Sequence, residues 1–138
     1  MGSVKVFLDS NVLFSTTFGS EPFLLLWEIA RAGKLQLVTS AYCNTEALDN
    51  LRHKRPDAVD RYGKLMEIVG EVPDGQDKLE WARRFVPNKD APVLAAAVAA
   101  GAEVLVTGDL KHFAVLMDRS DLPLRIRTIR AFLLEGPQ

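Results

Sequence analysis

The sequence is short of the residues on which many kinds of functional site depend. Its single cysteine, Cys43, excludes an internal disulfide and fits a reducing compartment. No CxxC pair or closely spaced histidine pair suggests zinc, and no Ser-based nucleophile elbow is present. Glycine-rich phosphate loops of the dinucleotide and nucleoside-triphosphate types are missing as well. These absences narrow the expected chemistry to carboxylates.

Long apolar runs and a strong net charge are also absent. No apolar stretch approaches the ~20 residues that a membrane span needs, and the first residues show neither a signal peptide nor a myristoylation site. We therefore expect a cytoplasmic protein without a membrane partner. The net charge of −1 is nearly neutral, so any affinity for nucleic acid must come from local basic patches.

The pattern of apolar runs predicts one α/β domain over residues 1–138. Residues 4–8 and 104–106 are unbroken apolar runs, as expected of strands that are covered on both faces of a parallel sheet. Further strands are expected at 35–38 and 124–126, with helical patterns between them. We interpret residues 57–87 as a helical insertion above the sheet, with a very short edge strand before the turn at Pro73 as an open alternative.

Residues 88–113 join a helix, a strand and two carboxylates. The alanine-rich run predicts a buried helix that starts near Asp90, which can cap it, and ends at Gly101. Asp109 follows the strand after this helix. Because the helix runs antiparallel to that strand, both acids lie at the rim where ligands bind in open α/β sheets. We therefore expect Asp90 and Asp109 to be neighbours, although each alone is also a common cap or turn residue.

Two further acids are expected at the same rim. Asp9 directly follows the first strand, with Ser10 and Asn11 as polar neighbours. Glu46 lies about 9 Å along the helix that Ser40 caps, and it reaches the rim if it faces inward; a solvated surface position is the alternative. Four acids from four elements suit hard divalent cations such as Mg²⁺ or Mn²⁺, which bind phosphate oxygens.

These segments resemble the acidic motifs of the PIN domain family. FLDSNVL is similar to the first motif, the Glu46 helix to the second, KDAPVLAAAV to the third and LVTGDLKHF to the fourth. The resemblance spans nearly the whole chain and implies a three-layer α/β/α fold with a parallel sheet of about five strands. It implies catalysis and metal ligation by Asp9, Glu46, Asp90 and Asp109. Support is expected from Asn11 and Thr107.

The resemblance also implies an activity. PIN domains are metal-dependent nucleases, mostly of RNA, and many are the toxin half of prokaryotic toxin and antitoxin pairs. We therefore predict a toxin-type endoribonuclease that uses Mg²⁺ or Mn²⁺ to activate water, with RNA as substrate and an antitoxin protein as partner. A homodimer is an open alternative to a monomer.

One position departs from the family pattern. Many members carry a further acid three residues after the last motif's Asp, where this chain has His112. A histidine there can still hold a water or a phosphate. The sequence therefore leaves open whether the site binds one metal ion or two.

Two other functions fit parts of the pattern. An aspartyl-phosphate phosphatase also places an Asp after its first strand, but the acid that it needs two residues later is Asn11 here. A non-catalytic PIN-like RNA-binding or scaffold domain would have lost one or more acids, whereas four are retained.

Two basic groups are candidates for contacts with the RNA backbone. The first lies at the end of the Glu46 helix, where positive charge also suits the helix dipole. It consists of Arg52, Lys54 and Arg55. The second group surrounds the last strand and consists of Arg125, Arg127 and Arg130.

Overall fold

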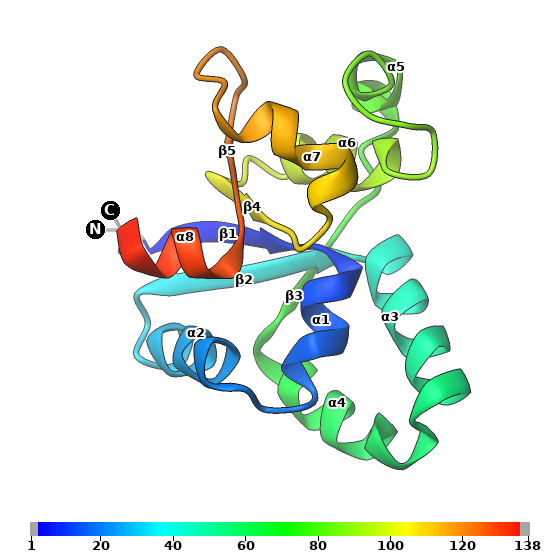
Figure 1. Cartoon of the computed structure of the whole chain (residues 1–138), viewed down its shortest axis with the longest axis vertical. Helices are drawn as coiled ribbons and strands as arrows, with labels where there is room; N and C mark the ends of the chain where they lie inside the picture. The colour runs from blue at the N-terminus through cyan, green and yellow to red at the C-terminus, as the bar shows by residue number, and fades with distance from the viewer. Residues whose placement is uncertain (1–2, 136–138) are drawn as a thin grey trace.

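A five-stranded parallel sheet forms the middle layer of the computed structural model, which describes residues 3–135 (Figure 1). Its order is β3-β2-β1-β4-β5, and every neighbouring pair is parallel. The strands are β1 (Val4–Leu8), β2 (Leu35–Ser40), β3 (Gly70–Val72), β4 (Val104–Val106) and β5 (Arg125–Arg127). The predicted α/β fold with about five parallel strands is confirmed.

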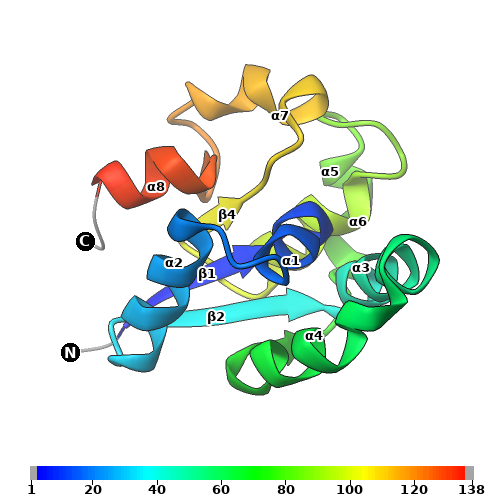
Figure 2. The same cartoon turned by 60° about the horizontal axis from the view of Figure 1, so that its bottom comes forward.

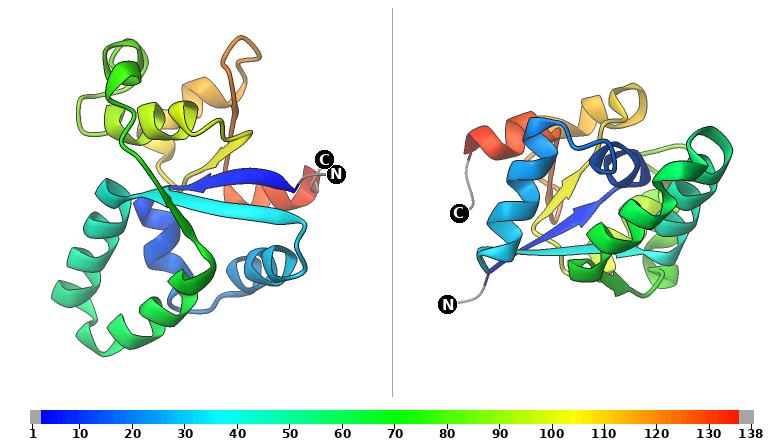
Figure 3. Two further views of the ribbon diagram at one scale, coloured as in Figure 1. Left: turned by 180° about the vertical axis from the view of Figure 1, so that it is seen from behind. Right: turned by 90° about the horizontal axis from the view of Figure 1, so that it is seen from below.

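Helices cover both faces of the sheet (Figures 1 and 3). One layer holds α1 (Ser10–Thr16), α2 (Glu21–Arg31), α3 (Ala41–Lys54) and α4 (Val59–Leu65). The other holds α5 (Leu79–Ala82), α6 (Ala91–Ala99) and α7 (Leu110–Met117). The last helix, α8 (Ile129–Glu135), packs beside α2. Short 3₁₀ turns lie at Pro56–Ala58, Met66–Ile68 and Gln76–Lys78. Within residues 3–135, every helix is too short or too polar to cross a membrane.

The central strands are buried because both of their faces are covered. Val6, Phe7 and Leu8 of β1 and all of β4 are inaccessible to solvent. Helix α6 lies close to neighbouring segments because four of its buried residues are alanines. Gly75 packs against it so tightly that an added Cβ would collide with the carbonyl oxygen of Ala95. This close packing fixes the position of the residues that begin α6.

The connections change sides at the carboxyl ends of β1 and β4, which form the rim expected from the sequence. The chain leaves β1 towards the α1 layer, whereas β4 is reached through α6 in the opposite layer. β1 and β2 end on the same side, where α1 and α3 begin (Figure 2). Such a reversal of strand order is where ligands bind in open α/β sheets.

Four details of the sequence-based prediction are wrong. Ser10 and Asn11 lie in the first turn of α1, a helix that the sequence pattern did not predict. Residues 57–87 are not an insertion, because Gly70–Val72 is the edge strand β3, which pairs with β2. The spacing of Leu79, Ala82 and Phe85 predicts a helix through Phe85, but the helix ends at Ala82. β5 starts one residue later than expected and includes Arg127.

Candidate active site

Asp9 is the most firmly held carboxylate at the rim. It is 3% exposed and is the N-cap of α1, where its Oδ1 accepts a hydrogen bond from the backbone nitrogen of Ser10 at 2.7 Å. Its Oδ2 accepts from the hydroxyl of Thr107 at 2.8 Å and from Nδ2 of Asn11 at 3.3 Å. Burial raises the pKa of Asp9, while the bonds from Thr107 and Ser10 lower it. The hydrogen bonds fix the direction in which this carboxylate points.

Thr107 and Asn11 join the ends of β1 and β4. The Thr107 hydroxyl, which donates to Asp9, also accepts a bond from the backbone nitrogen of Asp109 at 3.0 Å. Oδ1 of Asn11 accepts from the backbone nitrogen of Gly108 at 2.7 Å. A Cβ at Gly108 would lie 3.1 Å from that same oxygen, so the residue's small size permits the approach. These bonds hold the loop after β4 against the first turn of α1.

The single cysteine lies next to Asp9, and its thiol is unreactive. Cys43 is fully buried in α3, with its sulfur 3.9 Å from Oδ1 of Asp9. Burial, and then the Asp9 carboxylate, raise the pKa of the thiol to about 12. The thiol is therefore protonated near neutral pH and is not a nucleophile.

Glu46 reaches the rim from α3 through a neighbouring hydroxyl. The hydroxyl of Ser10 donates a hydrogen bond to Oε1 of Glu46. One turn earlier on α3, the hydroxyl of Tyr42 donates to the backbone oxygen of Lys89 at 2.7 Å. That bond ties α3 to the segment before Asp90. The structure thus settles the direction that the sequence left open, since Glu46 points to the rim although it remains exposed to solvent.

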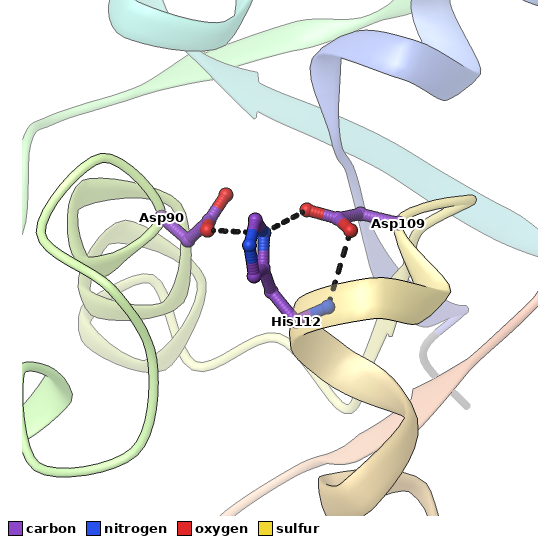
Figure 4. A group of neighbouring side chains, drawn as sticks. All are labelled: Asp90, Asp109 and His112. Carbon is purple, nitrogen blue, oxygen red and sulfur yellow. Dashed lines mark hydrogen bonds and ion pairs between the residues drawn. The ribbon is translucent and has the colours of Figure 1, made fainter.

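Asp90, Asp109 and His112 form a compact group on the α6 and α7 side of the rim (Figure 4). Nδ1 of His112 lies 2.9 Å from Oδ2 of Asp90 and 2.9 Å from Oδ2 of Asp109. Asp109 is the N-cap of α7 and accepts from the backbone nitrogen of His112 at 3.2 Å. Asp90 and Asp109 are therefore neighbours, as the antiparallel helix and strand predicted.

The side chain of Asp90 does not cap α6, which corrects the prediction that it can do so. It is 8% exposed, and burial followed by the charge of Asp109 raises its pKa. A single proton on Nδ1 of His112 can serve only one of the two facing carboxylates. When it serves Asp109, the buried Oδ2 of Asp90 has no hydrogen-bond donor. A buried carboxylate oxygen without a donor is costly unless a proton or a cation lies against it.

The four acids do not form one equal cluster. Asp90 and Asp109 group with His112, their ligand atoms all lying within 4.8 Å of one another. Asp9 is linked to this group through Thr107, and Glu46 through Ser10. The structure therefore brings all four predicted acids to one rim. Asp90 and Asp109 form a group with His112, and Asp9 and Glu46 lie outside that group.

Two grooves adjoin the rim. The larger, about 610 Å³, lies between α3, α6 and the 74–79 segment, and Tyr42, Glu46 and Gln76 are among its lining residues. The smaller, about 220 Å³, lies between α1 and α3. It is lined by Ser10, Asn11, Phe14, Ser15, Asn50 and Lys54. The smaller groove therefore leads from the carboxylates to the basic end of α3.

The basic cluster of α3 is exposed and partly held by aromatic rings. Nζ of Lys54 lies 5.7 Å from the ring centre of Phe14. The guanidinium of Arg55 lies 5.2 Å from the ring of Phe18 and pairs with Asp57 at 3.0 Å. Arg52 contacts Asp49 at 3.9 Å, and both of these side chains are mostly exposed. Lys54 is the member of this cluster that lines the smaller groove.

The C-terminal arginines are engaged differently. Arg125 and Arg127 both pair with Glu135 of α8, at 3.0 and 2.8 Å. Arg127 also donates to the backbone oxygen of Met117. These bonds compensate much of the positive charge within the fold. Arg130 is exposed on α8.

Two features of the site were not evident from the sequence, namely the bond from Ser10 to Glu46 and the bridge that His112 makes between two carboxylates. The sequence indicated Ser10 only as a polar neighbour of Asp9. Its position in a helix, facing α3, is what brings it to Glu46. The signal for His112 was its spacing of three residues from Asp109, because such residues lie on one face of a helix.

Comparison with known proteins relates these features to a family. A sequence model described as PIN domain matches residues 5–111. No curated protein matches the chain.

Several solved structures share the fold at low identity. VapBC2 from Rickettsia felis, bound to a DNA fragment from their promoter, has a TM-score of 0.71 and 14% identity, covering 91% of this chain and 98% of that chain. A toxin-antitoxin complex from Klebsiella pneumoniae has a TM-score of 0.64 and 19% identity, covering 88% and 99%. VapC20 from Mycobacterium tuberculosis, a toxin that cleaves the sarcin-ricin loop, has a TM-score of 0.57 and 16% identity, covering 80% and 94%.

Proposed function

This chain belongs to the PIN domain family, and from that premise we propose that it is a divalent-metal-dependent endoribonuclease of the toxin type. The observation that carries the proposal is the buried Oδ2 of Asp90, which faces the carboxylate of Asp109 and lacks a hydrogen-bond donor when Nδ1 of His112 serves Asp109. Two carboxylates held together in this way repel each other unless a cation lies between them.

The residues at the rim fit a divalent cation. Asp90 and Asp109 would hold it, with Asp9 and Glu46 completing an oxygen-rich site that suits Mg²⁺ or Mn²⁺. A bound divalent cation supplies a Lewis acid that neutralises charge on the scissile phosphate and makes a water molecule acidic enough to attack phosphorus.

The other polar residues keep the acids in place. Thr107 and Asn11 orient Asp9 by donating to its Oδ2, and Ser10 orients Glu46. Fixing these carboxylates before substrate binds avoids reorganisation during the reaction. The aspartyl-phosphate alternative is disfavoured, because Asp9 is 3% exposed and both of its oxygens already accept hydrogen bonds.

The smaller groove supports a path for the RNA backbone. It runs from Ser10 and Asn11 to Lys54, whose ammonium is exposed and lies over Phe14. Phosphates that follow this groove meet Lys54 and then Arg55. Arg125 and Arg127 are the weaker candidates, because neither lines this groove and both already bind the one carboxylate of Glu135.

The toxin assignment and an antitoxin partner are supported by the structural neighbours. The Klebsiella pneumoniae neighbour is a toxin-antitoxin complex, and the Mycobacterium tuberculosis neighbour is a toxin that cleaves the sarcin-ricin loop. A small protein encoded beside this chain's own gene is the partner to test by co-purification.

Cleavage of RNA and analysis of the new ends test the proposal. Attack by water on phosphorus, with departure of the 3′-oxygen, leaves a 5′-phosphate and a 3′-hydroxyl. We expect such ends from single-stranded or loop RNA with Mg²⁺ or Mn²⁺, and no cleavage after EDTA. Cleavage that survives EDTA, or 2′,3′-cyclic phosphate ends, would show that the RNA's own 2′-hydroxyl attacks and would overturn the metal-dependent mechanism.

A further inference from the structure

We propose that His112 is itself a ligand of the metal ion, and that the site therefore prefers Mn²⁺ and similar transition-metal ions to Mg²⁺. The inference rests on the metal-dependent activity proposed above and adds the identity of the ion. It concerns the one residue of the site whose chemistry differs from that of a carboxylate.

The position of the imidazole supports ligation. Nδ1 of His112 lies 2.9 Å from Oδ2 of Asp90 and 2.9 Å from Oδ2 of Asp109 (Figure 4). Two ligand atoms at right angles around an ion with bonds of ~2.1 Å lie about 3.0 Å apart. The nitrogen is therefore separated from each oxygen by the distance that adjacent ligands of one octahedral ion have.

The surroundings of Asp90 point independently to a cation. Its Oδ2 is buried, has no hydrogen-bond donor and faces the same nitrogen. The histidine cannot satisfy both carboxylates with one Nδ1 proton. With the ring proton on Nε2, the unprotonated Nδ1 and one oxygen of each carboxylate would be three ligands available to one ion.

The ligand set then decides between metals. Oxygen-only sites suit Mg²⁺, whereas imidazole nitrogen is a ligand of transition-metal ions, and Mn²⁺ accepts both carboxylate and imidazole. Replacing a carboxylate by a neutral imidazole also removes one negative charge from a site for a hard cation. The loss of charge weakens the binding of both ions, whereas the nitrogen ligand favours Mn²⁺ over Mg²⁺.

The histidine content of the chain allows a sharp test. The sequence contains two histidines, and the other, His53, is exposed near the end of α3. Pulsed electron paramagnetic resonance of Mn²⁺ bound to the RNA-free protein detects a coordinated nitrogen directly. We expect nitrogen coupling in the wild type and in His53→Asp, and none in His112→Asp. Calorimetry on the same proteins should show that His112→Asp lowers the ratio of the Mg²⁺ to the Mn²⁺ dissociation constant by about tenfold or more.

Each other outcome has a defined meaning. Absent coupling in wild-type protein that binds Mn²⁺, coupling that persists in His112→Asp, or an unchanged ratio would overturn the role of His112 and leave the proposed nuclease intact. Wild-type protein that binds no divalent ion would overturn both. The wild-type spectrum alone decides the question if His112→Asp does not fold.

Discussion

The hydroxyl of Ser10 donates a hydrogen bond to Glu46, which ties the first turn of α1 to α3 at the rim. Ser10→Ala releases the Glu46 carboxylate, so we expect nuclease activity to fall by roughly 10–100-fold, the usual effect of losing a group that orients a ligand. Ser20→Ala is the control, because Ser20 makes no side-chain cap bond. Equal activities of the two variants in a cleavage assay would show that Glu46 needs no such positioning.

Thr107→Val tests the junction of β1 and β4. The change keeps the shape but removes the donor to Asp9, so we expect a loss of about 1–3 kcal/mol in unfolding free energy and a clear loss of activity. Thr39→Val is a matched control, because Thr39 is equally buried and donates at 2.8 Å to a backbone oxygen, that of Leu8. Denaturant melts should show similar destabilisation of both variants, with activity lost only in Thr107→Val.

Asp90→Asn tests metal binding without relying on cleavage alone. Because the side chain of Asp90 makes no cap bond, the substitution leaves helix α6 intact. We expect Mn²⁺ to raise the melting temperature of the wild type and to have little effect on Asp90→Asn, whose activity should fall by at least about 100-fold. Asp60→Asn, on the exposed face of α4, should respond to Mn²⁺ like the wild type. Equal shifts for Asp90→Asn and Asp60→Asn would remove Asp90 from the site.

The difference in unfolding free energy between metal-free Asp90→Asn and the wild type should depend on pH, and the raised pKa of Asp90 fixes its direction. Burial, and then the charge of Asp109, raise the pKa of Asp90 above 3.8, so ionisation of this carboxyl destabilises the metal-free folded state. That cost is present above the folded pKa and disappears as the pH falls towards 3.8. Metal-free Asp90→Asn should therefore be more stable than the wild type near pH ~7, and the difference should shrink towards pH ~4. Urea melts in EDTA across this range measure it, and a difference that grows on acidification would contradict it.

Neutralising the basic end of α3 should alter RNA binding in a salt-dependent way. For Lys54→Gln and Arg55→Gln we expect the slope of log affinity against log salt to fall by about 0.7 for each phosphate of a single strand that the variant no longer neutralises. Lys34→Gln is the control, because Lys34 is exposed and precedes β2 at the opposite end of the sheet. The slopes come from binding curves at several salt concentrations, measured in a background that does not cleave RNA. Equal slopes for the α3 variants and for Lys34→Gln would show that the RNA backbone does not contact this end of α3.

Gly75→Ala should destabilise the fold through overpacking. A methyl group there meets the carbonyl of Ala95, so we expect a decrease of about 1–3 kcal/mol in unfolding free energy. Gly63→Ala is the opposite case, because Gly63 lies within α4 and an added Cβ meets nothing within 4 Å. It should stabilise the protein by about 0.5–1 kcal/mol. Thermal melts measure both variants. Melting temperatures that shift in the same direction would contradict the close packing of Gly75 against α6.

The strongly patterned elements were predictable from the sequence, and the short ones were not. The apolar runs of β1 and β4 and the alanines of α6 leave few alternatives for a buried strand or helix. Helix α1 was missed because Asp9-Ser10-Asn11 has the composition of a turn and the helix has only seven residues. Strand β3 was only an alternative in the sequence, as a very short edge strand before Pro73, because Gly70–Val72 contains one large apolar residue; its pairing with β2 depends on the tertiary fold.

The sequence was enough to predict which residues lie at the rim, but not which side chains bind one another there. The antiparallel relation of α6 and β4 is enough to bring Asp90 and Asp109 to one rim. Side-chain partners are decided by rotamers and packing, which a sequence pattern does not contain. The bond from Ser10 to Glu46 and the place of His112 between two carboxylates therefore required the structure.

The hydrogen bond between Thr107 and Asp9 joins residues 98 positions apart in the chain. Ribosomes deliver the amino-terminal part of a protein first, and β1 lacks its β4 neighbour until that strand has left the exit tunnel. Asp90, Asp109 and His112 also emerge late. A nascent chain therefore carries Asp9 and Glu46 without the rest of the carboxylate site. We therefore expect the proposed nuclease to become active only after its whole chain has left the ribosome.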